Sequence, residues 1–367
     1  IKQYEKISNH IELHIDNVLK SGKYIMGPEV YELEEALSKF INVKYCISCS
    51  SGTDALIMAL MARGVKSGDA ILTTPFTFIA TAEAIQIVGA TPVFVDIDCN
   101  TFNINPLLIS NAINFCKNKG LNPIGIIPVD LFGLPADYNI INKIAKENSL
   151  FVLEDAAQSF GGKINTKHAC SFGETAITSF FPAKPLGCYG DGGAIFTDNE
   201  NQAAILQSIR VHGEGIDKYN NIRTGINGRL DTIQAAILLE KLKIFPEEII
   251  QRNNIAEYYT KNLPKQLRPQ TITKNYQSAW AQYSIIAESN NARKHAMQKM
   301  NQNNIPTMIY YKTPLHLQKV FQYLNYKKGD FPIAENISKK IFSIPMHPYL
   351  KRSEQNIILD MLHTLYE

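Results

Sequence analysis

Short apolar runs alternate with longer amphipathic stretches over the first two-thirds of the sequence. Runs too short for helices, separated by stretches with a helical period, are typical of parallel βαβ units. The runs predicted to be strands are Tyr45–Ser48, Ala70–Thr73, Pro92–Asp96, Ile124–Val129, Phe151–Glu154, Ile177–Phe180 and Gly193–Thr197. The stretches predicted to be helices are Thr53–Arg63, Ile79–Val88, Pro106–Lys117 and Asp137–Asn148. This order predicts a doubly wound, mostly parallel sheet, in which ligands lie at the carboxyl ends of the strands.

The pattern changes near residue 229, where strands become rare. A long helical stretch, Leu230–Leu263, is expected to be interrupted at Pro246. The elements predicted after it are a strand at Gln282–Ala287 and helices at Ala292–Asn301, around Glu335–Phe342 and at Ser353–Tyr366. The sequence therefore predicts an N-terminal arm at residues 1–22 outside both domains, a large domain at 23–240 and a smaller α/β domain at 241–367.

Composition narrows the class of protein. The net charge of +3 in 367 residues, with the basic residues scattered, argues against partners such as nucleic acid or an anionic membrane. No apolar run approaches the roughly 18 to 20 residues that span a bilayer, and the N-terminus has no signal core. Six cysteines do not indicate a disulfide scaffold, and Cys46-Ile-Ser-Cys49 is interpreted as part of a buried strand. We expect a soluble, cytoplasmic protein with no metal site.

The first candidate site segment is Ser51-Gly-Thr-Asp54, between a predicted strand and a predicted helix. Gly52 allows close approach of the backbone, and Thr53 with the first helical N–H groups could bind a phosphate. A plain helix N-cap is the alternative interpretation.

Two later strands also end in candidate residues. Phe78 follows one strand and could stack on a planar cofactor, or it could belong to the core. Asp155 ends another strand, where a carboxylate is costly unless a cation such as a protonated ring nitrogen pairs with it. An ordinary N-cap explains Asp155 equally well, and Gln158 lies about one turn further on.

The stretch from Ser179 to Ala194 is the most informative one. Ser179 ends a strand, Lys184 lies in a turn flanked by prolines, and four glycines follow within nine residues. A lysine among apolar residues is partly desolvated, which lowers its pKa and makes the amine nucleophilic. A phosphate cradle, a stacking ring, a carboxylate and such a lysine together indicate pyridoxal 5′-phosphate (PLP) as the cofactor.

These segments resemble the DegT/StrS family of nucleotide-sugar aminotransferases from about Gly22 to the C-terminus. The resemblance rests on SGTDAL, PFTFIAT, EDAAQSFG, SFFPAKPLGCYGDGGAIFT, NGRLDTIQAAIL and SIPMHPYL. It implies the aspartate-aminotransferase-like fold (PLP fold type I), with a large cofactor domain, a small C-terminal domain, and a homodimer with shared active sites.

The resemblance also implies a role for each matching residue. Lys184 would form the Schiff base with the cofactor and carry the proton, and Asp155 would hold the pyridine nitrogen protonated. Phe78 would stack on the ring and Gln158 would bind its 3′ oxygen. The residues implied to bind the phosphate are Gly52, Thr53, Ser179 and, from the partner subunit, Asn227. The candidates for the sugar side are Arg229, Tyr310 and His316.

The implied reaction moves the amine of L-glutamate, which leaves as 2-oxoglutarate, onto a nucleotide-linked keto-sugar for surface polysaccharide or glycan biosynthesis. The amino-acid sequence of the lysine segment is most similar to that of enzymes acting on UDP-linked 3-keto N-acetylamino sugars or uronates. Tyr310-Tyr-Lys312 replaces the His-Tyr-Pro of many relatives, so a 4-keto-6-deoxy sugar linked to UDP or dTDP stays open. A non-catalytic regulatory relative is a further alternative. Lys184 excludes the dehydratases of the family that carry His at this position.

Overall fold

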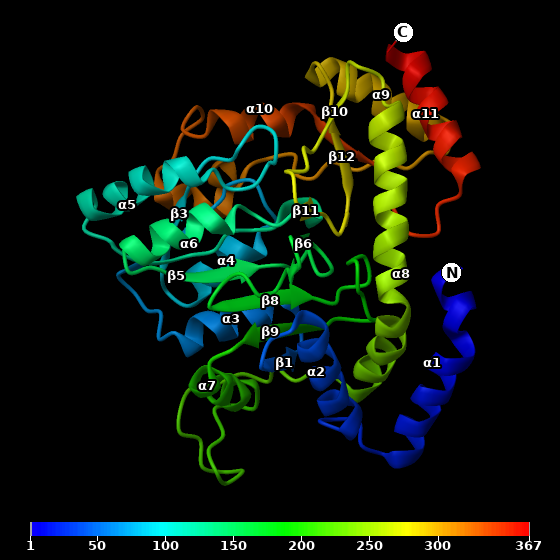
Figure 1. The fold of residues 1–367 in the computed structure, drawn as a ribbon. Coiled ribbons are helices and arrows are strands. Elements are labelled where there is room, and N and C mark those ends of the chain that lie inside the picture. Colours follow the sequence, from blue (N-terminus) through cyan, green and yellow to red (C-terminus); the bar gives the residue numbers. More distant parts are fainter. Residues whose placement is uncertain (1, 367) are drawn as a thin grey trace.

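The computed structural model describes residues 2–366 and contains two α/β units joined by one long helix (Figure 1). Within these residues, the large domain holds a seven-stranded sheet in the order β1-β9-β8-β5-β4-β2-β3. Only β9 runs antiparallel to its neighbours, so the predicted mostly parallel sheet is confirmed. The strands are β1 (Tyr45–Cys49), β2 (Asp69–Thr73), β3 (Thr91–Phe94), β4 (Asn122–Ile126), β5 (Phe151–Asp155), β8 (Thr175–Ser179) and β9 (Gly193–Thr197).

Helices cover both faces of this sheet. One face carries α3 (Gly52–Ala62), α4 (Ala80–Ile87) and α7 (Glu200–Arg210), and the other carries α2 (Pro28–Ile41), α5 (Ile109–Asn118) and α6 (Tyr138–Glu147). Successive strand residues serve opposite faces, as Cys46 packs into one core cluster and Ile47 into the other. The doubly wound arrangement is therefore confirmed, although the sequence did not predict α2 or α7.

Helix α8 (Thr232–Asn262) runs from the large domain to the small one (Figure 1). The predicted interruption at Pro246 is wrong, because the helix continues through this residue. Phe245 and Ile249 pack into the core of the large domain, whereas Ile255 and Tyr259 pack into that of the small domain. Burial on both sides of Pro246 offsets the lost N–H and the steric cost of an internal proline. The predicted domain boundary at 240/241 thus falls inside one continuous helix.

The small domain is built on the three-stranded antiparallel sheet β10-β12-β13. The predicted helix around Glu335–Phe342 is only partly right, because the helix ends at Lys340 and a strand begins at once. The elements of this part are β10 (Arg268–Pro269), β12 (Tyr283–Ile286), α9 (Asn290–Gln302), α10 (Pro332–Lys340), β13 (Ile341–Ile344) and α11 (Arg352–Tyr366). A third small sheet joins β6 (Lys163–Ile164), β7 (Lys167–His168) and β11 (Tyr276–Gln277).

The N-terminal segment forms helix α1 (Lys2–Ser21), which lies along the lower half of α8 (Figure 1). Ile7, Ile11 and Val18 are buried, and the first two cluster with Ile237 of α8. The predicted N-terminal arm is a helix in residues 2–21, and its apolar stripe is covered by α8. Residue 1 of the predicted arm lies outside the described residues. Among residues 2–366, no helix combines the length and the apolar character needed to cross a membrane.

Candidate active site

A cavity of about 620 Å³ opens at the carboxyl ends of the parallel strands. Its wall on the large domain comes from segments that follow β1, β2, β5 and β8, and Gln282, Tyr310 and Tyr311 close it from the small domain. The predicted site residues that line this one cavity are Gly52, Thr53, Phe78, Asp155, Gln158, Ser179, Lys184 and Tyr310. These residues come from segments that are far apart in the sequence. Those on the large domain meet because their segments follow strands whose carboxyl ends lie at the same edge of the sheet.

The N-terminus of α3 forms one end of the cavity. The Ser51 hydroxyl caps the helix by accepting the N–H of Asp54 at 3.0 Å, so the N-cap interpretation holds for Ser51. A Cβ on Gly52 would lie 2.7 Å from the Cβ of Ser179, a distance that only glycine avoids. The close approach leaves the first N–H groups of the helix and the Ser179 hydroxyl side by side. This arrangement suits a phosphate, because the first helical N–H groups have no partner inside the helix.

Asp155 is buried at the end of β5. Its Oδ2 accepts the Thr81 hydroxyl at 2.7 Å, and its Oδ1 accepts the N–H of Ala157 at 3.2 Å. Burial raises the pKa of this carboxyl, while the hydrogen bonds and the positive charge of Lys184 oppose the rise. No α-helix begins at Asp155, so the N-cap alternative does not apply. A buried carboxylate facing a cavity can pair with a cation there.

Gln158 and Phe78 line the cavity between these two ends. The Oε1 of Gln158 accepts the backbone N–H of Phe132 at 2.8 Å, and its Nε2 donates to the Tyr311 hydroxyl at 3.3 Å. These two contacts fix the orientation of the amide. The ring of Phe78 is 55% exposed, whereas Phe76 is fully buried. Core packing therefore describes Phe76, and Phe78 offers an open aromatic face.

Lys184 lies in the turn that follows β8. Its backbone N–H donates to the carbonyl of Phe181 at 2.8 Å, and the N–H of Cys188 donates to that of Phe180 at 2.8 Å. Burial lowers the pKa of the Lys184 amine, and the nearby charge of Asp155 opposes this shift. A lower pKa increases the fraction of neutral amine, which is the form that acts as a nucleophile or base.

Three predicted residues do not line the cavity: Asn227, Arg229 and His316. Asn227 is exposed and forms a β-bridge with Val211 before α8 begins. His316 is only 2% exposed, with its Nε2 3.1 Å from Oε1 of Glu335 and its ring packed on Phe331. These contacts hold His316 inside the small domain, so we withdraw it as a sugar ligand.

The sequence did not single out several residues of the site. Thr81 bonds to Asp155, Tyr311 bonds to Gln158, and Gln282 and Asp191 also line the cavity. The Thr77 hydroxyl is buried, lines the cavity and has no hydrogen-bond partner among the described residues. Thr77 and Thr81 both lie in the PFTFIAT segment, which was the available signal.

These residues fit PLP. The α3 N-terminus and Ser179 would hold the phosphate, Asp155 would pair with the ring nitrogen, and Lys184 would bind the aldehyde carbon. The buried Thr77 hydroxyl has no hydrogen-bond partner among the described residues, and the ring of Phe78, whose aromatic neighbour is Tyr311 at 6.5 Å, is still 55% exposed. A bound cofactor would offer a partner to the hydroxyl and a stacking surface to the ring.

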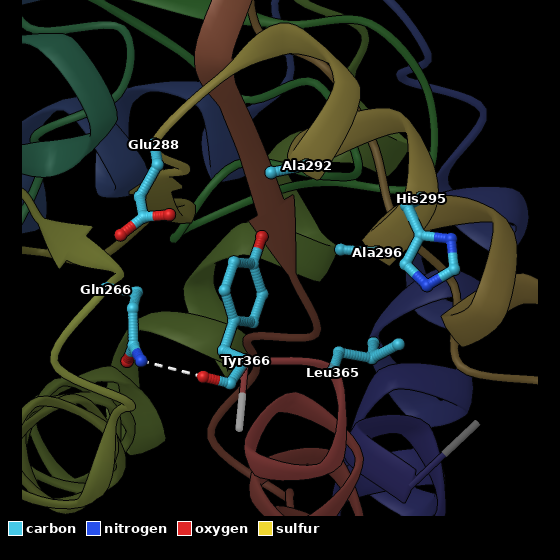
Figure 2. A pocket seen from close by; sticks show the side chains of 7 residues that line it. All are labelled: Gln266, Glu288, Ala292, His295, Ala296, Leu365 and Tyr366. Carbon is cyan, nitrogen blue, oxygen red and sulfur yellow. Dashed lines mark hydrogen bonds between the residues drawn. The ribbon is translucent and has the colours of Figure 1, made fainter.

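A second hollow lies elsewhere, at the outer end of the small domain (Figure 2). It has a volume of about 360 Å³ and is lined by side chains of α9 and α11 together with Gln266 and Glu288. None of the predicted site residues lies in it.

Comparison with known proteins decides the family. Residues 5–363 match the model of the DegT/DnrJ/EryC1/StrS aminotransferase family. The chain belongs to this family. The predicted resemblance is thereby confirmed, and the protein is a PLP-dependent aminotransferase.

Three relatives within the family show its range. The UDP-2-acetamido-2-deoxy-3-oxo-D-glucuronate aminotransferase of Pseudomonas aeruginosa is 44% identical over 97% of this chain and 96% of its own length. The Pleiotropic regulatory protein of Geobacillus stearothermophilus is 40% identical over 100% of this chain and 96% of its own length. The UDP-N-acetyl-3-dehydro-alpha-D-glucosamine 3-aminotransferase of Acidithiobacillus ferrooxidans is 34% identical over 96% of this chain and 92% of its own length.

Solved structures of this family confirm the fold and the cofactor. A DegT/DnrJ/EryC1/StrS aminotransferase from Brucella abortus has 45% identity and a TM-score of 0.96, covering 100% of this chain and 97% of that protein. NtdA from Bacillus subtilis was solved with bound cofactor PMP. It has 29% identity and a TM-score of 0.90, and the match covers 98% of this chain and 82% of that protein.

Proposed function

We propose that this aminotransferase moves the amine of L-glutamate onto a nucleotide-linked keto-sugar. The observation that carries the proposal is the single cavity in which Lys184, Asp155 and the α3 N-terminus meet. The same lysine can serve both half-reactions, because each half removes a proton from one carbon and delivers it to another, and one amine can do both.

The roles of the residues follow from their places in the cavity. Bound PLP supplies a conjugated ring that accommodates the electron pair released when a C–H bond breaks. Lys184 Nζ removes the proton from the amine-bearing carbon of glutamate, and it delivers a proton to the sugar carbon in the second half. Asp155 keeps the ring nitrogen protonated through its negative charge. Thr81 holds Oδ2 of Asp155 in place.

A UDP-linked N-acetylamino sugar or uronate with a keto group at C3 is the substrate class we favour. The two relatives from Pseudomonas aeruginosa and Acidithiobacillus ferrooxidans carry names of enzymes that act on such UDP-linked 3-oxo and 3-dehydro sugars. Arg229 suits the carboxylate of a uronate, because a guanidinium pairs bidentately with it. Since Arg229 lies outside the cavity of its own protomer, this contact needs a second subunit.

We further propose a homodimer that acts in the cytoplasm. The segment between α7 and α8 projects from the large domain (Figure 1) and exposes the apolar side chains of Ile216 and Tyr219. A partner that covers this segment would receive Asn227 beside its own cavity. All six cysteines are free thiols, which fits a reducing compartment. Light scattering should give twice the mass of the chain, and mixing inactive Lys184→Ala subunits with Asn227→Ala subunits should restore activity.

A regulatory role is the second candidate, favoured by the name of the Geobacillus relative. A regulator that only binds PLP needs no turnover, whereas the enzyme converts bound cofactor whenever glutamate is added. The two roles therefore differ in one half-reaction that needs no sugar.

A panel of keto-sugars tests the substrate. The purified protein receives L-glutamate and UDP- or dTDP-linked 3-keto and 4-keto sugars, and 2-oxoglutarate is measured. We expect release with UDP-linked 3-keto sugars above all. Turnover only with small 2-oxo acids would contradict a sugar acceptor, and preference for a 4-keto-6-deoxy sugar would move the assignment to the alternative class.

A further inference from the structure

A second buried carboxylate lies beside the segment that carries Asp155. Asp130 follows β4, is fully buried and forms no ion pair within residues 2–366. Burial raises the pKa of this carboxyl to about 7, and the negative charge of Asp155 adds to the rise. A buried carboxylate without a cation is costly, so packing alone does not explain why this one is present.

Three donors hold the two oxygens of the Asp130 carboxylate. Its Oδ1 accepts the backbone N–H of Ala136 at 2.9 Å and the hydroxyl of Tyr138 at 2.8 Å. Its Oδ2 accepts the hydroxyl of Ser159 at 2.7 Å. Ala136 and Tyr138 belong to the chain that follows β4, whereas Ser159 belongs to the chain that follows β5. The carboxylate therefore ties these two stretches of chain together.

The stretch that contains Ser159 also carries two residues of the cofactor cavity, Asp155 and Gln158. At its start, the backbone N–H of Asp130 donates to the carbonyl of Asp155 at 3.1 Å. Further on, the backbone N–H of Phe132 donates to Oε1 of Gln158 at 2.8 Å. The hydrogen bond between Asp130 and Ser159 joins the same two stretches a third time, one residue beyond Gln158.

Neither Asp130 nor Ser159 lines the cofactor cavity in the part of the chain that the structure describes. Both side chains are fully buried, so water does not compete for the hydrogen bond between them. Any effect of this pair on the cofactor must therefore pass through the residues of the cavity wall that it holds.

We propose that Asp130 is a positioning residue for the cofactor ring. Through Ser159 it fixes the stretch that carries Asp155 and Gln158. Both of these side chains thereby keep their places relative to the Lys184 amine. The inference rests on the roles proposed for the cavity residues and adds one that does not touch the cavity. Proton transfer depends steeply on geometry, since a displacement of about 1 Å can cost about 10²-fold in rate.

Ser159→Ala tests this role, with Tyr138→Phe as the matched control. Each variant removes one hydroxyl that donates to the same carboxylate at nearly the same distance, and each leaves that carboxylate two donors. Both should therefore destabilise the fold to a similar extent. Only Ser159→Ala should disturb the cofactor. We expect about tenfold weaker binding of PLP, a shifted visible band of lysine-bound cofactor, and at least about tenfold slower conversion of this band at saturating glutamate.

Tyr138→Phe should stay within about twofold of the unchanged protein in PLP affinity and conversion rate, with its band in place. In Ser159→Ala the glutamate concentration that gives half the maximal rate should stay within about threefold, because the lost contact orients the ring and does not bind glutamate. Equal effects of Ser159→Ala and Tyr138→Phe on the band and on PLP affinity would reduce Asp130 to a purely structural residue and overturn the proposal.

A double-variant cycle tests whether Asp130 acts through Ser159. Asp130→Ala should weaken PLP binding at least as much as Ser159→Ala does. Combining the two should add no more than about twofold, since both remove the same contact. Effects that simply multiply would contradict this route. If Asp130→Ala fails to fold, the comparison of Ser159→Ala with Tyr138→Phe decides alone.

These measurements need PLP and glutamate but no sugar, so they report separately from the sugar panel. Failure of every keto-sugar as an acceptor would refute the proposed substrate and leave the role of Asp130 standing. Normal amination of a keto-sugar, with an unchanged cofactor band and PLP affinity in Ser159→Ala, would refute only this inference.

Discussion

The two walls of the cofactor cavity are built differently. The wall on the large domain consists of residues at or just after the ends of β1, β2, β5 and β8, and those at β1, β5 and β8 are held by short contacts to a neighbouring strand or helix. The wall on the small domain consists of Gln282, Tyr310 and Tyr311, which come from irregular segments. The positions of the first group follow from the register of the sheet. Those of the second group follow from how the small domain packs.

This difference separates chemistry from selectivity. In the proposed function, Lys184, Asp155 and the α3 N-terminus supply the base, the charge at the ring nitrogen and the phosphate site that amine transfer needs. The small-domain wall meets whatever group the cofactor acts upon. We therefore expect changes on the sheet side to affect rate and cofactor affinity, and changes on the small-domain side to affect the Michaelis constant for the acceptor.

Removal of the reactive amine should have the largest effect. Lys184→Ala should lower amine transfer by about 10⁴-fold, because the base for both half-reactions is lost. A coupled assay for 2-oxoglutarate measures it, with Lys243→Ala as the control on a mostly exposed lysine. Activity within tenfold of the unchanged protein would mean that another group acts as the base.

Loss of the Asp155 charge should have the second-largest effect on amine transfer. Asp155→Asn should lower the rate by about 10²- to 10³-fold, since a neutral amide does not hold the ring nitrogen protonated. In the protein without cofactor, the same change should lower the pKa of Lys184 further, because the Asp155 charge now raises it. The pH dependence of Lys184 labelling by an amine reagent measures this shift.

Thr81 provides a graded version of that experiment. Thr81→Val removes a hydrogen bond to Asp155 worth about 1.5–3 kcal/mol, which corresponds to roughly ten- to a hundredfold in rate. Thr81→Ser keeps the hydroxyl and should behave like the unchanged protein. If Val and Ser at this position gave the same rate, the hydrogen bond would have no role in positioning the carboxylate.

Crowding of the phosphate cradle should have a moderate effect. Gly52→Ala places a methyl group 2.7 Å from the Cβ of Ser179, so α3 or β8 must shift. We expect a loss of about 1–3 kcal/mol in the free energy of unfolding and about tenfold weaker binding of PLP. In Gly190→Ala the new methyl group would lie 3.2 Å from the flexible side chain of Gln234, so the loss in the free energy of unfolding should be smaller. Equal PLP affinity in both variants would argue against a phosphate at Gly52.

The smallest effects on catalysis should come from the small domain. Tyr310→Phe should raise the Michaelis constant for the sugar by about three- to tenfold and leave PLP affinity unchanged, because one neutral hydrogen bond is lost. His316→Ala should lower the free energy of unfolding by about 1–3 kcal/mol without changing that constant, since the Glu335 contact is internal. A changed Michaelis constant in His316→Ala would return His316 to the sugar site.

The same contrast explains what the sequence could predict. A residue at the end of a buried parallel strand has its place set by the sheet, so strand order predicted that Gly52, Asp155 and Lys184 lie near one edge, and all three line the one cavity. The Thr81–Asp155 hydrogen bond joins residues 74 positions apart, and no local pattern indicates it. His316 was misplaced because its burial against Glu335 and Phe331 depends on how α10 packs. The unbroken helix at Pro246 likewise depends on burial in two separate cores.

The absorbance spectrum of the PLP-loaded protein, recorded before and after L-glutamate, tests the central claim most directly. The claim is that Lys184 in this cavity performs amine transfer. We predict a visible band of lysine-bound cofactor that disappears on addition of glutamate, returns when a nucleotide-linked keto-sugar is added, and is missing or unresponsive in Lys184→Ala. A protein that binds no PLP, or whose band ignores glutamate, would contradict the account.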